Sequence, residues 1–127
     1  MMSEIRRILE TGKSMGVPTA IPSPEDFRRA AESLGYDLPG SYIEFCKLGG
    51  LGELGFSHRI LSPDEILATR TDVPGSLVPF ADNGCGDLFC WPVDGGTEPA
   101  VIFHDQETQQ SSPAAPSFTE WLARNRL

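Results

Sequence analysis

The sequence lacks the features that would place it in a membrane or on nucleic acid. It has no apolar run near the roughly 20 residues that a membrane-spanning helix requires. The N-terminal MMSEIRRILE carries charges within its apolar pattern, which is unlike a secretory signal. Cations are scarce, with 10 Lys and Arg against 18 Asp and Glu, and a net charge of −8 repels phosphate backbones. We therefore expect a cytoplasmic chain that binds neither membrane nor nucleic acid.

Cysteine is also scarce, and its three positions do not form a pattern. Cys46, Cys85 and Cys90 are an odd number, which argues against a disulfide framework. His58 and His104 lie at no recognisable metal-binding spacing. Cys46 falls on the apolar face of a predicted helix, where a small core residue is expected. We expect no metal and no cofactor.

What remains is an ordinary globular composition, 39% hydrophobic and 22% charged over 127 residues. This length suffices for one domain with its own core. We expect one domain over 1–127, in which an N-terminal helix and a flexible loop over 1–22 precede a core over 23–127. The loop prediction rests on the Gly, Pro and Ser content of 12–22.

Helical spacing of apolar residues predicts helices that begin near Ser3, Ser23, Leu38, Ser62 and Ser117. Ser23 and Ser62 are each followed by proline and, three residues on, by an acidic residue, which is the pattern of a capping box. Between these helices, Leu54–Phe56 and Arg59–Leu61 are candidate short strands. Glycines in this stretch weaken that assignment.

The stretch Leu77–Val93 predicts a β-hairpin, because Asn83-Gly84 tolerates the positive φ of a tight turn. Its second strand is apolar on both faces, so it is either a central strand covered twice or a strand with one face kept for a partner. A strand over Pro99–His104 follows, and then a polar loop. Helices, antiparallel strands and a closing helix indicate an α+β fold, with a twisted antiparallel sheet packed against N-terminal helices and a C-terminal helix.

Four segments, in this order, resemble motifs of the SUKH superfamily and together span about residues 23–126. They are Leu38-Pro39 with Tyr42, Phe45 and Gly49-Gly50; Pro79-Phe80-Ala81 with Gly84 and Gly86-Asp87; Val101–Asp105; and Ser117-Phe118 with Trp121-Leu122. Two positions depart from the pattern: Cys46 replaces a larger apolar residue, and Leu48 replaces an asparagine before the glycine pair.

The resemblance implies a sheet packed against helices and a function in binding. Many bacterial members are immunity proteins that neutralise toxins, often nucleases or deaminases, and others are regulatory scaffolds, as in fungal cell-wall signalling. The family pattern carries no catalytic set. The resemblance therefore implies a non-enzymatic immunity-type protein whose partner is a basic toxin domain. The alternative is a regulatory scaffold of the same fold with an unrelated partner.

Acidic residues on the hairpin and its neighbours are the candidate contacts for such a partner, because a basic protein is attracted to them. With Trp91 as an aromatic anchor, the candidate set is Asp82, Asp87, Trp91, Asp94, Glu98, His104 and Asp105. Structural alternatives exist, since Asp82 and Asp87 can bond turn amides and Trp91 can be a core residue. A Cys85–His104 nucleophile and base is a further reading, but no third residue orients the imidazole.

Overall fold

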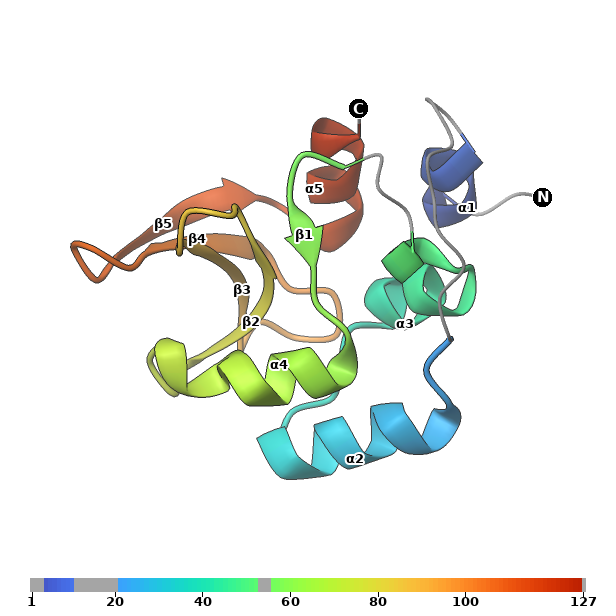
Figure 1. Ribbon diagram of the computed structural model, residues 1–127, viewed down its shortest axis with the longest axis horizontal. Helices are drawn as coiled ribbons and strands as arrows, with labels where there is room; N and C mark the ends of the chain where they lie inside the picture. Colours follow the sequence, from blue (N-terminus) through green and yellow to red (C-terminus); the bar gives the residue numbers. More distant parts are fainter. Residues whose placement is uncertain (1–3, 11–20, 53–55, 127) are drawn as a thin grey trace.

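The computed structural model describes residues 4–10, 21–52 and 56–126, and it shows the α+β fold expected from the sequence (Figure 1). Its elements in chain order are α1 (Glu4–Glu10), α2 (Pro24–Leu34), α3 (Gly40–Lys47), the 3₁₀ turn η1 (Gly50–Gly52), β1 (Arg59–Ile60), α4 (Pro63–Thr69), the 3₁₀ turn η2 (Arg70–Asp72), β2 (Leu77–Asp82), β3 (Leu88–Pro92), β4 (Val101–Asp105), β5 (Gln110–Ala115) and α5 (Phe118–Asn125). Residues 11–20, most of the loop expected to be flexible, and Leu54 and Gly55 of the first candidate strand lie outside the described ranges. No helix in those ranges has both the length and the hydrophobicity needed to cross a membrane.

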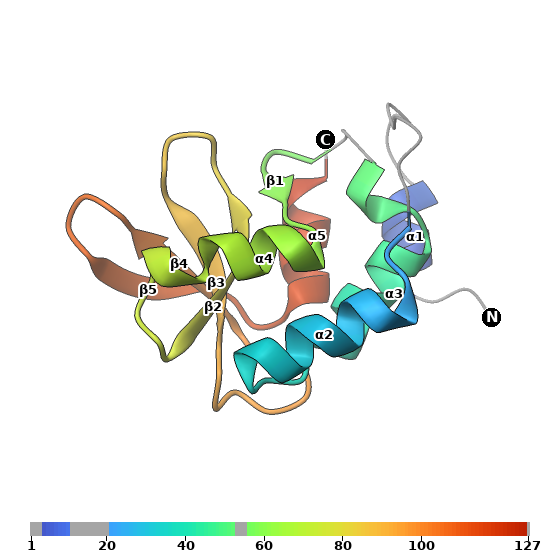
Figure 2. The same ribbon diagram turned by 60° about the horizontal axis from the view of Figure 1, so that its bottom comes forward.

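Within the described ranges, five strands form one antiparallel sheet in the order β1-β2-β3-β4-β5. Each strand pairs with the next along the chain, so β3 is the central strand, as one reading of its two apolar faces predicted. Helices α3 and α5 pack together beside the sheet, and α2 packs against α4 (Figures 1 and 2). On the opposite face, Val73 from the connection after η2 packs with Leu88 and Cys90. Both faces of β3 are therefore covered.

The capping boxes predicted at Ser23 and Ser62 are present. Ser23 Oγ accepts a hydrogen bond from the Asp26 amide at 3.2 Å, and Asp26 accepts one from the Ser23 amide at 2.8 Å. Ser62 and Glu65 repeat this exchange at 3.2 and 2.9 Å. Gly35, with φ +64°, ends α2 in the left-handed conformation that glycine adopts without steric cost. Local sequence thus determines where α2 and α4 begin.

Strand β5 corrects the prediction of a polar loop between the third strand and the last helix. Its sequence, QSSPAA, has no β-branched or aromatic residue and contains Pro113. It becomes a strand because a tight turn, with Gln109 at φ +59°, folds it back onto β4. The sheet edge accepts this sequence, because proline is tolerated on an edge strand.

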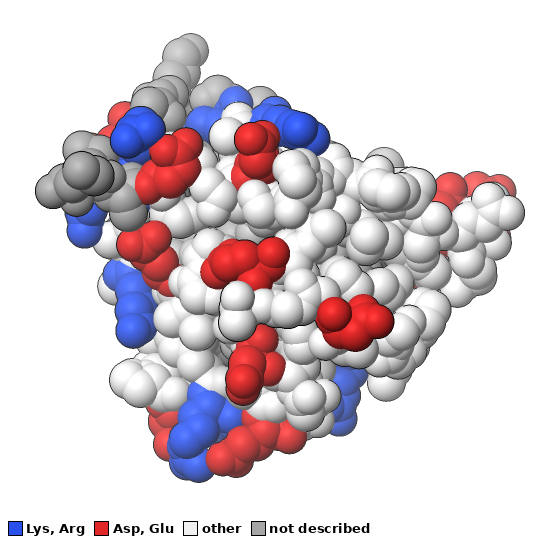
Figure 3. All heavy atoms as spheres, turned by 180° about the vertical axis from the view of Figure 1, so that it is seen from behind, with Lys and Arg blue, Asp and Glu red and all other residues white. Residues whose placement is uncertain are grey.

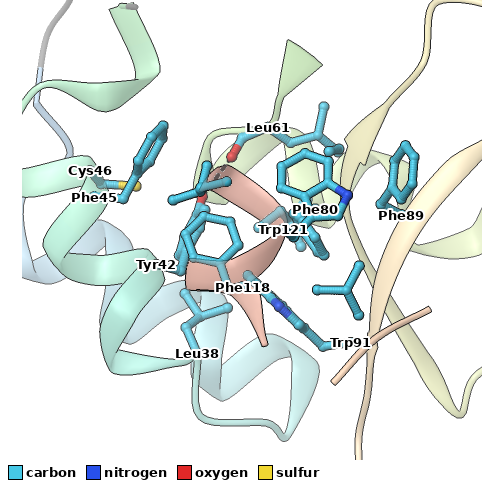
Figure 4. Close-up of a cluster of buried hydrophobic side chains, with 14 of the residues drawn as sticks. Leu38, Tyr42, Phe45, Cys46, Leu61, Phe80, Phe89, Trp91, Phe118 and Trp121 are labelled. Carbon is cyan, nitrogen blue, oxygen red and sulfur yellow. Dashed lines mark hydrogen bonds between the residues drawn. The ribbon is translucent and has the colours of Figure 1, made fainter. Parts of the chain in front are cut away.

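An aromatic cluster joins the sheet to the helices, and Phe118 lies within it (Figure 4). Its ring centroid is 5.4 Å from Phe80, 5.7 Å from Phe45 and 5.8 Å from Trp91. Phe80 enters this cluster because the β2–β3 register shifts there: Pro79 pairs with Cys90 and Ala81 with Phe89, which leaves Phe80 as the extra residue of a bulge. Cys46 and Trp121, both expected in the core, are 1% and 2% exposed.

Candidate partner-binding surface

Asp82, Asp87 and Asp105 come to the same end of the sheet, where the β2–β3 and β4–β5 turns lie side by side. Asp87 joins the two turns, because its Oδ1 accepts a hydrogen bond from the Gln106 amide at 3.1 Å and its Oδ2 accepts one from Asn83 Nδ2 at 3.0 Å. Asp105 Oδ1 accepts hydrogen bonds from the amides of Glu107 and Thr108, the two middle residues of the β4–β5 turn. These carboxylates therefore organise the turns, and their contact with a partner stays a prediction.

The Asp82 carboxylate also forms an ion pair within the chain. Arg59 of β1 lies opposite it in the sheet, and Arg59 Nη2 is 2.8 Å from an Asp82 carboxylate oxygen. The same guanidinium reaches Glu65 of α4 at 2.5 Å. One arginine thus links the edge strand, β2 and α4, and its single positive charge, shared with Glu65, offsets part of the charge that Asp82 would offer to a basic partner.

Trp91 and His104 are not on the surface, which corrects their assignment as partner contacts. Both side chains are 0% exposed. Trp91 stacks on Phe80 with centroids 4.4 Å apart, and Figure 4 shows it within the buried cluster. His104 lies on the other sheet face, where its Nδ1 is 2.9 Å from Ser111 Oγ. For Trp91, the error arises because β3 is apolar on both faces, and this pattern does not show which face other elements cover.

Cys85 and His104, the candidate nucleophile and base, also differ in burial. Cys85 is exposed on the β2–β3 turn and is a free thiol, whereas His104 is buried and bonds to Ser111. In the described part of the chain, no three His, Cys, Asp or Glu side chains are grouped to hold a metal ion.

The remaining two candidates, Asp94 and Glu98, lie in the connection between β3 and β4, which forms one wall of a groove. We name this the Tyr36 groove; its volume is about 440 Å³, and it is lined by Gly35, Tyr36, Asp37, Leu38 and Gly40 on one side and by Val93, Asp94, Gly96 and Thr97 on the other. The two walls are the α2–α3 and β3–β4 connections, which run beside each other in Figure 2. Sequence reasoning did not select Tyr36 or Asp37, because both lie in a connection without a periodic pattern.

Glu98 holds the two walls together. Its carboxylate accepts hydrogen bonds from the Ser41 amide at 2.9 Å and the Ser41 hydroxyl at 2.6 Å. Because Ser41 is in the first turn of α3, whose N-cap position is Pro39, Glu98 acts as a cap contributed from a distant part of the sequence. Burial, and secondly the Glu98 charge, raise the pKa of Tyr36 well above its ordinary value.

A family model describes residues 21–124 of the chain, and that model is the SMI1 / KNR4 family (SUKH-1). The chain belongs to this family. No curated protein sequence matches it. The SUKH family includes immunity proteins, and its domains are generally non-enzymatic.

The SUKH motif residues have structural roles in this chain. Gly49 has φ +84° at the end of α3, and a Cβ on Gly50 would lie 2.5 Å from the Phe45 ring. Gly84 and Gly86 have φ +80° and +97° in the β2–β3 turn. The other motif side chains share deep burial at the helix–sheet contact; they are Leu38, Pro39, Tyr42, Phe45, Phe80, Phe118 and Trp121. The family signature therefore describes the core together with the turns that need glycine.

Proposed function

We propose that the protein is an immunity-type protein that binds a basic bacterial toxin domain and blocks it without chemistry of its own. Membership of a family that includes immunity proteins supports this proposal. The observation that carries it further is the distribution of charge over the surface of the chain.

The arginines of the helices and of β1 are engaged within the chain. Arg28 pairs with Glu25 and Glu32 on its own helix, and Arg29 pairs with Asp26. Arg59 pairs with Glu65 and Asp82, and Arg124 lies 3.6 Å from Glu120. These pairs cancel the positive charge locally, and because Arg28 and Arg59 each meet two carboxylates, acidic charge stays in excess even there.

Several carboxylates have neither an ion pair nor a side-chain hydrogen bond with a described residue: Asp37, Glu44, Asp72, Asp94 and Glu107. In Figure 3, acidic side chains spread across the middle of the face shown, while Lys and Arg lie toward its margins. Such a surface attracts a basic partner and speeds its association, and the attraction is screened by salt.

Co-expression with candidate toxin genes, beginning with any that lies next to the gene for this chain, tests the proposal. The expected result is that the chain restores growth of cells that express the toxin, and that the purified proteins form a complex whose association slows as salt rises. An unrelated acidic protein of similar size and net charge is the control. Failure to restore growth, or rescue through degradation of the toxin, contradicts the proposal. Capture of a non-toxic partner instead supports a scaffold.

A further inference from the structure

The Tyr36 groove has the dimensions of a binding site. Its volume of about 440 Å³ lies within the roughly 300–1,000 Å³ range of ligand pockets. Glycine at Gly35, in the left-handed conformation at the end of α2, turns the chain into one wall. Val93, at 42% exposure one of the exposed large apolar residues, lies on the other.

The two walls each carry a carboxylate without a counter-charge. Asp37 and Asp94 are exposed, and neither is paired with a residue in the described ranges. This distinguishes them from Asp26, Asp64 and Asp82, each of which has an arginine within 4 Å. Among the described residues, none that lines the groove is a cation. Its electrostatic character is therefore uniformly negative.

Tyr36 supplies an independent observation. The side chain is 7% exposed and lines the groove, yet its hydroxyl has no hydrogen-bond partner in the described structure. A buried polar group without a partner costs stability, and native proteins leave few of them. Its ring lies 6.5 Å from Trp91, which fixes its position against the core. A rigid residue with an unsatisfied hydroxyl thus lines the same groove as the two unpaired carboxylates.

We propose that the Tyr36 groove receives a basic side chain, arginine or lysine, of the partner protein; this rests on the proposed function, since it takes the partner to be a basic protein. The cation donates hydrogen bonds to Asp37 and Asp94, one from each wall. The Tyr36 oxygen is a further acceptor at the groove, and the aliphatic stem of the basic side chain packs on Val93 and Leu38. An acidic or phosphorylated ligand would instead face two like charges.

A titration of the isolated protein tests the groove without any toxin. N-acetyl-arginine methylamide and N-acetyl-lysine methylamide are added separately while the backbone amides are followed by NMR, with the glutamate derivative as a control. The expected result is saturable, millimolar binding with shifts at Gly35, Gly96 and Thr97, and none from glutamate. Of the two cations, the one that binds more tightly identifies the side chain.

Matched double variants make the test specific. Asp37→Asn with Asp94→Asn removes the groove charge, and Asp72→Asn with Glu107→Gln removes the same charge outside it. The variant with both groove substitutions should lose the chemical-shift changes, and the control double variant should keep them. Tyr36→Phe, which removes no hydrogen bond to a residue in the described ranges, should weaken binding several-fold in a folded protein. No saturable shift, or equal loss in both pairs, overturns the groove assignment.

In the toxin complex, the groove pair should weaken the affinity about tenfold relative to the control pair. If the parent chain neutralises the toxin and the two double variants bind it equally well, the proposed function stands and the groove assignment fails. Binding of the arginine or lysine derivative by a chain that neutralises no toxin overturns the proposed function alone.

Discussion

Glu98 caps helix α3 from 57 residues further along the chain. Its carboxylate accepts hydrogen bonds from both the amide and the hydroxyl of Ser41, in the first turn of α3. The N-cap position of α3, Pro39, makes no side-chain cap hydrogen bond. A residue expected to meet a partner thus stabilises the helix that carries the Leu38-Pro39 motif.

Glu98→Ala should lower the free energy of unfolding by about 1 kcal/mol, because it leaves the first turn of α3 without its acceptor. Urea denaturation monitored by circular dichroism measures this. Glu107→Ala is the matched control, since the Glu107 side chain makes no hydrogen bond with a described residue. Equal stability losses in the two variants would show that the Ser41 contact contributes nothing.

Removing the two tyrosine hydroxyls should have opposite effects. Tyr42 donates a hydrogen bond to the Leu61 carbonyl at 2.6 Å, and both residues are fully buried (Figure 4). Tyr42→Phe should therefore cost about 1–3 kcal/mol, because that carbonyl loses its donor. Tyr36→Phe should leave stability unchanged or raise it, because the Tyr36 hydroxyl has no hydrogen-bond partner in the part of the chain that the structure describes. Paired thermal and urea unfolding curves provide the comparison; a loss for Tyr36→Phe as large as that for Tyr42→Phe contradicts it.

The glycine pair after α3 should tolerate alanine at neither position, for two different reasons. Gly49→Ala places a Cβ on a residue at φ +84°, at a cost of about 1–2 kcal/mol. Gly50→Ala drives a Cβ to 2.5 Å from a fully buried Phe45 ring, and overpacking of this kind costs about 1–3 kcal/mol.

Gly75→Ala is the control for both, because a Cβ there meets nothing within 4 Å and φ is not positive. Its stability should stay within about 0.5 kcal/mol of the parent chain. The measurement is the urea midpoint at constant m-value. Tolerance of Gly50→Ala would mean that the Phe45 ring has room to move.

Stability should fall in mildly acidic solution because of His58. Its ring lies 4.7 Å from Phe89 and 5.9 Å from Trp121, and desolvation there lowers its pKa below the ordinary 6.5, against smaller opposing effects of Asp82 and Asn125. The unfolded chain therefore takes up the proton first as the pH drops through about 6.5. The His58 contribution is complete above that pH and is lost toward the lower pKa of the folded state.

His58→Phe should flatten this dependence, because phenylalanine keeps an aromatic ring between Phe89 and Trp121 without a titrating group. Urea midpoints at pH 7.5 and 5.5 measure the difference in slope between the two proteins. The same loss of stability in both would assign the pH dependence to other groups.

Local signals predicted the local structure well. Ser23 and Ser62 determined the starts of α2 and α4, because a capping box depends only on residues within one turn. The hairpin turn at Asn83-Gly84 was predicted for the same kind of reason. Strand β5 was missed because its pairing with β4, and not its own composition, makes it a strand.

Burial and the groove required the tertiary structure. The alternation in β3 placed Trp91 and Cys90 on opposite faces, but only the packing of α5 and of Val73 shows that both faces are closed. Tyr36 and Asp37 meet Asp94 across connections that are more than fifty residues apart in the sequence. An unpaired tyrosine hydroxyl has no signature in a single sequence, because its partners would come from elsewhere in the fold.

The order of the strands determines which strands form the edges of the sheet, where strands of other molecules could pair. The outermost strands are β1, only two residues long, and β5, which carries Pro113 and an extra residue at Ala114. Neither margin offers a long, regular row of amides on which a foreign strand can grow. We therefore expect that contact with other proteins uses side chains and that the concentrated protein resists fibre formation by sheet extension.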